Sequence, residues 1–498
     1  LSGGTGPGAP IFWTGRNRWI AWGQVVLHAS VSDLFEETLD PGDPRRYALR
    51  GGWREVDRVV ESIAVRGEPD ETLEILESRN GPLLGAVHPD DARLRSLALR
   101  WTGQDRRSGM DALLRLQHAQ DWQGFRHALR RLSAPPATFL YADRAGRIGL
   151  QLAGHLPLRA IETGLLPVPG RSRYYDWRGF VPFKELPHQF GSQLPFLVAS
   201  TRPEMPGLPH PVTWLWHPGR AEARLRELLE SSGPLDLERV LAIQRDVSSG
   251  QGRDRVRRLL DGVEPRHAPA ARVRELLLAW DGGTDPDAVG AAVYHVFRDS
   301  LARLLLAERV GEELEAEFVR LAEPFPGVLL DRFVERAAEE MGGGELAERA
   351  LEETWKTLEV RVSSNPRKWT WGRVHRLRLR HDFEALGEGP VAWLGRRLGR
   401  GPFPAPGDAD SIWTMYHREL PGSGILVGPA FRYAVALDDP AHARFGLAGG
   451  QSGHPGSVHY DDALADWLRG RARPLWTHRA DVADHEQSVW ELRPRHGP

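Results

Sequence analysis

The chain has 498 residues, with 65 Lys and Arg against 67 Asp and Glu, and its formal net charge is -2. This length suffices for two or three average domains, and the balanced charge offers no basic excess for nucleic acid. Cysteine is absent, which excludes disulfides, a thiol nucleophile and cysteine-ligated metals, and no apolar run is long enough to span a membrane.

The first residues give no sign of a targeting segment. Nothing in the opening turn resembles a signal peptide, and Leu1 to Gly4 resembles the middle of a longer sequence. We therefore expect a fragment or a processed product. Gly4-x-Gly6-x-x-Ala9 loosely matches a dinucleotide-binding motif, but no strand precedes it and Pro10 leads into a strand, so we reject that interpretation.

The most informative stretch runs from Gly15 to Glu37. A short strand at 11–15 and a turn at Arg16-Asn17 lead into a second strand at 18–23, which is rich in aromatic and branched residues. Residues 28–33 are polar and predict a loop that leaves the strand end. Backbone N–H groups in such a loop are well placed to face a ligand, and an edge strand with no ligand is the alternative.

The first half of the chain predicts antiparallel sheet with little helix. Period-two runs favour strands at 47–49, 56–65, 72–78 and 97–101, and a hairpin joins strands at 139–143 and 148–152. Helical spacing predicts a single helix over 110–132. A buried-type strand at 196–199 ends in Ser200-Thr201-Arg202-Pro203.

A long helical block follows, and then strands return. Apolar residues recur at helical spacing over 220–230, 235–246, 253–260, 270–280, 288–307, 312–321 and 345–360. Strands are expected at 375–381, 425–427 and 433–437, with a short helix at 461–470. This order predicts an α+β core with a helical insertion, divided at 1–217, 218–365 and 366–498.

Two local patterns carry no chemistry by themselves. Gly450-Gln451-Ser452-Gly453-His454 approaches a nucleophile elbow, but its last position is His and Pro455 prevents a following helix, so we expect a tight turn. His454 and His459 are too loosely spaced to indicate a metal site.

Many segments in order resemble the β chain of the penicillin acylase family of N-terminal-nucleophile hydrolases. They are Pro7-Gly8-Ala9-Pro10, Gly15-Arg16-Asn17, Ile20-Ala21-Trp22-Gly23, Asp33-Leu34-Phe35-Glu36-Glu37, Tyr141-Ala142-Asp143, Pro167-Val168-Pro169-Gly170, Asp176-Trp177-Arg178-Gly179, Trp369-x-Trp371-Gly372, Gly449-Gly450-Gln451-Ser452-Gly453-His454-Pro455 and His459-Tyr460-Asp461-Asp462. The resemblance covers essentially the whole chain. It implies an αββα sandwich with a mostly helical insertion.

The resemblance also implies an amide-bond hydrolase that acts on a small N-acyl amide. An N-terminal Ser attacks the carbonyl, and its own α-amine serves as the base through a water. Two donors then hold the oxyanion. Carried over, the backbone donor is at Val26, the side-chain donor position is at Ser200, and Arg220 matches an arginine near the first inserted helix with a one-residue shift. Thr14 and Gln24 would line the acyl pocket together with Val26.

This sequence departs from the family pattern at several positions. Ser200 replaces the usual Asn, and the nucleophile is expected upstream of Leu1, so we expect the chain alone to be inactive and to pair with a missing α chain and N-terminal β segment. Family members often bind calcium through two Asp. Asp33 matches one of them and Ser30 stands at the other, which predicts weak calcium binding or none.

Other expectations follow from the family alone. They are autoprocessing, a periplasmic or extracytoplasmic location in a bacterium, and a place in antibiotic metabolism. The acyl group stays open among phenylacetyl, aliphatic acyl-homoserine lactone and glutaryl substrates. A catalytically silent relative that binds an amide or acyl ligand is the alternative, and the residue at the processing point decides between the two.

Overall fold

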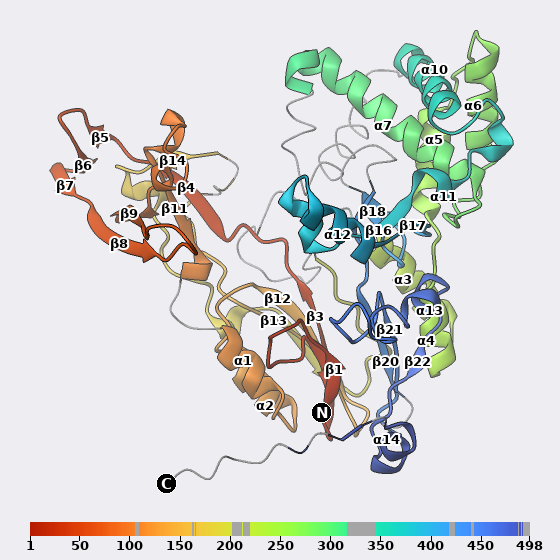
Figure 1. Ribbon diagram of the computed structural model, residues 1–498, viewed down its shortest axis with the longest axis horizontal. Helices are drawn as coiled ribbons and strands as arrows, with labels where there is room; N and C mark the ends of the chain where they lie inside the picture. Colours follow the sequence, from red (N-terminus) through yellow and green to blue (C-terminus); the bar gives the residue numbers. More distant parts are fainter. Residues whose placement is uncertain are drawn as a thin grey trace. The chain divides into compact units, whose positions relative to one another are not determined.

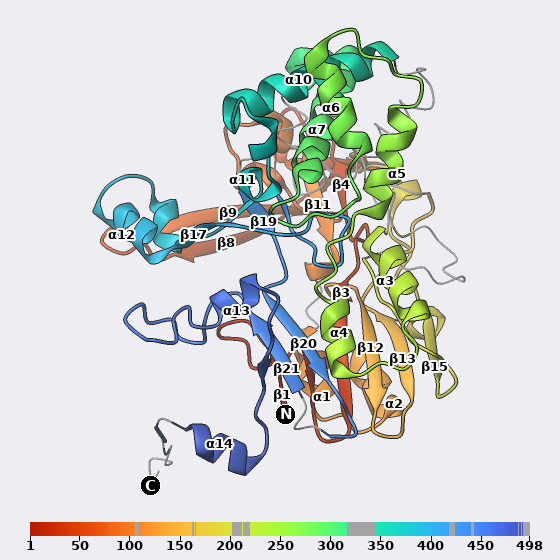
Figure 2. The same ribbon diagram turned by 90° about the vertical axis from the view of Figure 1, so that its right-hand side faces the viewer.

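The computed structural model describes residues 1–104, 109–161, 164, 166–201, 212, 220–315, 344–417, 424–439, 443–486, 488, 489 and 491. The chain divides into two compact units, Leu1–Trp216 and His217–Pro498. Each unit contains both helices and strands (Figures 1 and 2). The three-part division expected from the sequence stays a prediction.

A six-stranded antiparallel sheet forms the centre of the first unit. Its strand order is β1 (Ser2–Gly4), β2 (Thr14–Arg16), β3 (Ile20–Val26), β12 (Ala137–Asp143), β13 (Ile148–Ala153) and β15 (His188–Gly191). Helices α1 (Gly109–Leu116) and α2 (Trp122–Leu129) pack against this sheet (Figure 1). Alternate β3 residues Ile20 and Trp22 are buried in the same cluster as Phe125 of α2, which fixes the inner face of β3.

The single helix predicted over 110–132 is wrong, because the chain breaks between α1 and α2. Asn17 Nδ2 donates to the carbonyl oxygens of Gln117 and Ala119 over 3.2 and 2.6 Å, so these groups are not available to a continuous helix. Asp121 then caps α2 by accepting a hydrogen bond from the Gly124 N–H. The turn at Arg16-Asn17 therefore determines where the helix is interrupted.

Three smaller sheets complete the first unit. They contain β11 (Leu97–Trp101), β4 (Ser32–Glu36) and β14 (Val168–Pro169); β10 (Gly81–Pro82), β9 (Glu71–Ser78) and β8 (Asp57–Ile63); and β5 (Leu39–Asp40), β6 (Asp43–Leu49) and β7 (Gly52–Glu55). The predicted strands in this region and the predicted 139–152 hairpin are confirmed. The strand predicted at 196–199 is wrong, since these residues form no strand.

The second unit starts with a helical region. It contains α3 (Arg220–Ser231), α4 (Leu237–Ile243), α5 (Gly250–Leu259), α6 (Ala268–Leu278), α7 (Val289–Val310), α10 (Gly344–Arg361) and α11 (Trp371–Val374). Residues of α5, α6, α7, α10 and α11 share one buried apolar cluster, and Figure 2 shows α5, α6, α7 and α10 gathered together. The predicted helical block is thus confirmed, although most of the predicted 312–321 helix lies outside the described residues.

Short strands and helices follow this region. They are β16 (Arg376–Leu379), α12 (Pro390–Leu398), β17 (Arg400–Pro404), β18 (Tyr416–His417), β19 (Ile425–Val427), β20 (Phe431–Val435), β21 (Ala443–Leu447), α13 (Leu464–Leu468), β22 (Arg473–Pro474) and α14 (Arg479–His485). Strands β20, β21 and β22 form one antiparallel sheet. In the described part of the chain, no helix combines the length and the apolar character needed to cross a membrane.

Candidate functional site

Val26 is the last residue of β3, and the hydrogen bonds around it fix the direction of its N–H. Leu27 N–H donates to the Pro136 carbonyl oxygen over 2.9 Å. Val26 lies opposite Ala137, and hydrogen-bonded pairs alternate with non-hydrogen-bonded pairs in an antiparallel ladder. Val26 and Ala137 therefore form a non-hydrogen-bonded pair, and the Val26 N–H points away from β12.

The other side of β3 is open at Val26. Strand β2 lies on that side, but its pairing with β3 covers only Trp22 and Ala21. Among the described residues, no strand of the sheet continues beside Val26 on this side. The Val26 N–H thus faces a side of β3 that carries no paired strand among the described residues, and its role as a donor to a ligand stays a prediction.

Thr14 and Gln24 lie close to this edge but start from opposite faces of the sheet. A Cβ atom built on Gly23 would come within 4.0 Å of Thr14 Oγ1, so Thr14 shares the face of Gly23. Successive residues of a strand point to opposite faces, which places Gln24 on the face of Val26. Gln24 therefore also shares the face of Ile20 and Trp22, which packs against α1 and α2. The assignment of both to one acyl pocket stays a prediction.

Ser200 lies in an irregular, partly buried segment that runs beside the loop following Val26. The His28 N–H donates to the Thr201 carbonyl oxygen over 3.1 Å, and the Ser30 N–H donates to the Val212 carbonyl oxygen over 2.8 Å. The fold therefore brings the two candidate oxyanion donors, Val26 and Ser200, into one neighbourhood of the first unit.

Asp33, the candidate metal ligand, is enclosed by other partners. Its side chain is 1% exposed, and Oδ2 accepts a hydrogen bond from Arg159 Nε over 2.7 Å and another from Trp177 Nε1. Arg159 Nη2 also donates to the Ser30 backbone oxygen over 2.8 Å. Ca²⁺ needs six or more oxygen ligands, and here it would meet a guanidinium of like charge. The residues present do not fit a calcium ion.

No other metal site is evident within the described ranges. There, no three or more His, Asp or Glu side chains gather closely enough to hold a metal ion. His459 instead lies 3.2 Å from Asp462, with Nδ1 facing the carboxylate.

Glu37 and Gly170 belong to two of the family-like motifs and lie together, and Glu37 is 2% exposed. Ser78 Oγ and Asn80 Nδ2 donate to Glu37 Oε1 over 2.7 and 2.8 Å. A Cβ atom on Gly170 would lie only 2.2 Å from Glu37 Oε2, so any larger residue there would displace the Glu37 carboxylate. These motif residues hold the β4 region together and need no catalytic role.

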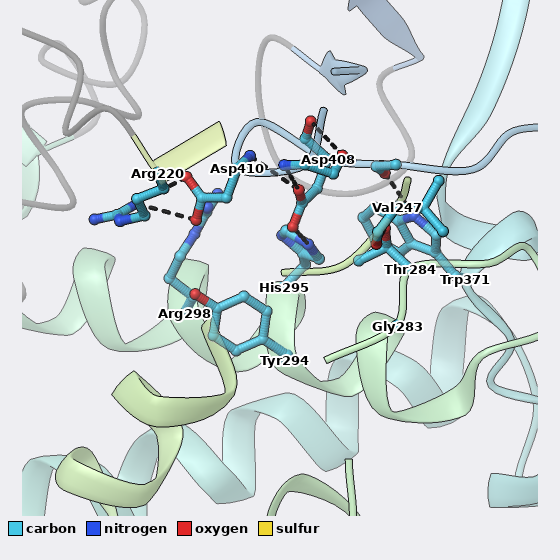
Figure 3. Close-up of polar contacts among 12 residues, drawn as sticks. Arg220, Val247, Gly283, Thr284, Tyr294, His295, Arg298, Trp371, Asp408 and Asp410 are labelled. Carbon is cyan, nitrogen blue, oxygen red and sulfur yellow. Dashed lines mark hydrogen bonds and ion pairs between the residues drawn. The ribbon is translucent and has the colours of Figure 1, made fainter. Parts of the chain in front are cut away.

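Arg220, the remaining candidate, lies at the start of α3 in the second unit. Its Nη1 donates to both carboxylate oxygens of Asp410 over 2.9 and 3.0 Å, and each side chain is 3% exposed (Figure 3). The pair lines a polar pocket of about 340 Å³, together with Arg224, Ser249 and Arg253. Asp410 compensates the charge of Arg220, so the pair forms a structural part of the pocket wall.

The loop that carries Asp410 is held by Asp408, as Figure 3 shows. Asp408 Oδ1 accepts from the N–H groups of Asp410 and Ser411 over 2.9 and 2.8 Å, and Oδ2 lies 3.2 Å from His295 Nε2. Burial alone would raise the pKa of Asp408, but the His295 ring and the Asp410 N–H hold it well below its usual value.

Trp371 connects this loop to two buried histidines. Its indole Nε1 donates to the Gly407 carbonyl oxygen over 3.0 Å, and its ring stacks between those of His295 and His375, at 4.3 and 4.2 Å between centroids. Burial lowers the pKa of His375 to about 3, with a further contribution from His295. The stack makes the Asp408 loop a rigid support for Asp410.

Sequence reasoning missed Arg159, Asp408 and Asp410. The sequence shows the Asp176-Trp177-Arg178-Gly179 motif but not the residue that it contacts, which is Asp33: Trp177 donates a hydrogen bond to it. No spacing or motif marks Arg159, whose contact with Asp33 spans 126 positions in the sequence.

A known family accounts for this fold. The penicillin amidase family model matches residues 1–484, and the chain belongs to that family. It is 27% identical to the acyl-homoserine lactone acylase QuiP of Pseudomonas aeruginosa over 93% of this chain and 60% of that protein. It is 28% identical to the penicillin acylase 2 proenzyme of a Pseudomonas species over 98% of this chain and 62% of that protein.

A relative from Escherichia coli, penicillin G acylase, is 24% identical over 98% of this chain and 60% of that protein. The chain thus spans about 60% of the length of the curated relatives that it matches. These relatives are named as acylases, which are hydrolases of amide bonds.

The fold is shared with a solved structure, the thermostable penicillin G acylase of Alcaligenes faecalis. The TM-score is 0.70 at 18% sequence identity, over 99% of this chain and 92% of that one. The α+β class and the N-terminal-nucleophile hydrolase fold expected from the sequence are confirmed.

Proposed function

We propose that the complete protein is an acylase that hydrolyses a small N-acyl amide. The observation that carries the proposal is the direction of the Val26 N–H, which points to the open side of β3. The Ser200-Thr201 segment supports it, because the fold ties this segment to the residues directly after Val26. Both donors expected from the family thus come from one part of the first unit.

These groups suit the charge that develops during acyl transfer. Attack of a serine oxygen on the amide carbonyl carbon puts a negative charge on the carbonyl oxygen, and a fixed N–H donor stabilises this charge most in the transition state. The amine then leaves with a proton, and water hydrolyses the acyl-enzyme ester. We assign the donors to this chain, and we assign the nucleophilic Ser to a segment upstream of Leu1 that precursor processing exposes.

The names of the relatives suggest two substrate classes. Acyl-homoserine lactones carry an aliphatic acyl amide, and penicillins carry a side-chain amide. Gln24 and Val26 form part of the acyl pocket in this proposal, and Ser200 is the weaker oxyanion donor. We also propose that the complete protein works outside the cytoplasm and pairs this chain with an α chain.

The test uses the complete protein, matured from its precursor, with an acyl-homoserine lactone, a penicillin and a phenylacetyl anilide as substrates. Release of free amine from at least one of them supports the proposal. Residues 1–498 alone, purified in the same way, should release none. A matured protein that binds these amides and cleaves none would instead be the catalytically silent relative.

A further inference from the structure

The strongest unassigned feature is the guanidinium of Arg159 in the first unit. It lies where the family resemblance expects a metal ion, and it joins two oxygens from the region after β3. Nε donates to Asp33 Oδ2 over 2.7 Å, and Nη2 donates to the Ser30 backbone oxygen over 2.8 Å. The Arg159 side chain is 9% exposed and that of Asp33 is 1% exposed, so this ion pair is shielded from water.

Neighbouring residues hold both the backbone next to Arg159 and its guanidinium group. The adjacent Leu158 N–H donates to the Gly179 carbonyl oxygen over 2.9 Å, and the Arg178 N–H donates to the Leu158 carbonyl oxygen over 2.7 Å. The Arg159 guanidinium carbon lies 5.4 Å from the centre of the Trp177 ring, and the Trp177 indole N–H donates to the same Asp33 oxygen. A planar fork fixed in this way loses little freedom when it binds both oxygens.

Arg159 binds one oxygen in the loop that follows Val26 and one in the next strand. Ser30 is in the middle of this loop, and Asp33 is in β4, directly after it. The same loop is tied through the His28 and Ser30 N–H groups to the Thr201 and Val212 carbonyl oxygens. The loop is therefore held by Arg159 and also by two backbone hydrogen bonds, to the Thr201 and Val212 carbonyl oxygens.

We propose that Arg159 is a positioning residue whose guanidinium does for this loop what a bound divalent cation would do. It neutralises Asp33 and fixes the Ser30 carbonyl, and so holds, without a metal, the loop through which His28 contacts the Ser200-Thr201 segment. The effect on turnover rests on the proposed function, whereas the effect on metal dependence and folding does not.

The first arm of the test measures thermal unfolding of the complete protein, matured from its precursor. We expect the melting temperature of the unaltered protein to stay the same with a chelator and with added CaCl₂. Arg159→Ala should lower it by on the order of 10 °C, since the buried Asp33 loses its counter-charge. The control is Arg178→Ala, which removes a nearby exposed arginine side chain and should change the melting temperature little.

Chemical rescue tests whether the loss of stability comes from the missing guanidinium and not from the substitution in general. Ethylguanidinium should raise the melting temperature of Arg159→Ala, and NaCl at the same ionic strength should not. Because Arg159→Ala could fail to fold, the double variant Arg159→Ala/Asp33→Asn removes both charges and should be the more stable of the two. The proposal is overturned if a chelator destabilises the unaltered protein, if Arg159→Ala matches Arg178→Ala, or if the double variant shows no recovery.

The second arm uses the same protein. The double variant should lower kcat more than it raises KM, because the donor acts on the transition state. An unchanged kcat would refute the positioning role. An unaltered protein that hydrolyses no amide would refute the proposed function and leave the thermal arm to decide the role of Arg159.

Discussion

The His28 N–H donates to the Thr201 carbonyl oxygen over 3.1 Å. This one hydrogen bond joins the residues after the end of β3 to a segment that comes much later in the sequence. Val26 lies two positions before His28, and Ser200 lies one position before Thr201. The two candidate oxyanion donors are therefore linked by the backbone itself, without help from a side chain.

The Val26 backbone donor can be removed without changing the neighbouring strand. Val26→Pro deletes the N–H, and β12 loses no hydrogen bond, because this N–H points away from it. In the complete protein we expect kcat to fall by about 10²–10³. Val26→Ala keeps the N–H and shortens a residue that is 46% exposed, so it should spare kcat and change mainly KM, through the acyl pocket. Full activity in a folded Val26→Pro protein would remove Val26 from the site.

The side chain of Ser200 is shorter than that of the Asn which the family resemblance expects at this position. Its hydroxyl sits one bond nearer to the backbone than the amide nitrogen of Asn, so it falls short of the oxyanion or acts through a water. We expect Ser200→Asn to raise kcat in the complete protein, with Ser200→Ala at or below the unaltered rate. The assay compares a phenylacetyl anilide with long-chain acyl amides. If Ser200→Asn leaves every cleaved substrate unaffected, Ser200 is not at the oxyanion.

The sequence predicted the strand that ends at Val26 better than it predicted the backbone before Ser200. The alternation in β3 is local, so the strand and the loop after it could be found from neighbouring residues. The apolar run at 196–199 predicted the wrong element, because Val198 is buried although the run pairs with no strand among the described residues. Arg159 could not be found at all, since an ion pair between distant residues leaves no periodic pattern.

The Arg220–Asp410 pair should matter for stability whatever its role in catalysis. Both side chains are 3% exposed, so Arg220→Met removes the positive charge that Arg220 supplies to the buried Asp410 carboxylate. We expect a loss of about 3–5 kcal/mol in the free energy of unfolding. The double variant Arg220→Met/Asp410→Leu should recover most of this loss in urea titrations. Equal losses in the two proteins would show that packing, and not charge, is what Arg220 contributes.

His375 should make the second unit sensitive to acid. Its pKa is lowered to about 3 in the fold by burial, against 6.5 for the exposed group. Between these values the unfolded chain binds a proton that the folded chain does not, so stability falls as the pH drops from about 6.5 to about 3. This one group contributes at most about 1.4 kcal/mol per pH unit.

The matched variant for this measurement is His375→Phe, which keeps a ring against Trp371 and does not titrate. The difference in unfolding free energy between the two proteins should be constant above pH 7. It should shift in favour of the variant as the pH falls below 6.5. A difference that is independent of pH from 7 to 4 would mean that the pKa of His375 is the same in the folded and the unfolded chain.

Asn17 sets a limit on the order of assembly during synthesis. Its side-chain oxygen accepts from the N–H groups of Trp19 and Ile20 over 2.8 and 2.9 Å, which closes the β2–β3 turn locally. Its side-chain nitrogen, however, reaches the carbonyl oxygens of Gln117 and Ala119. The ribosome makes the two strands before the helical pair, yet this buried amide cannot find all its partners until the chain has grown about a hundred residues further. The hairpin leaves the ribosome incomplete and is finished only when the helical pair arrives.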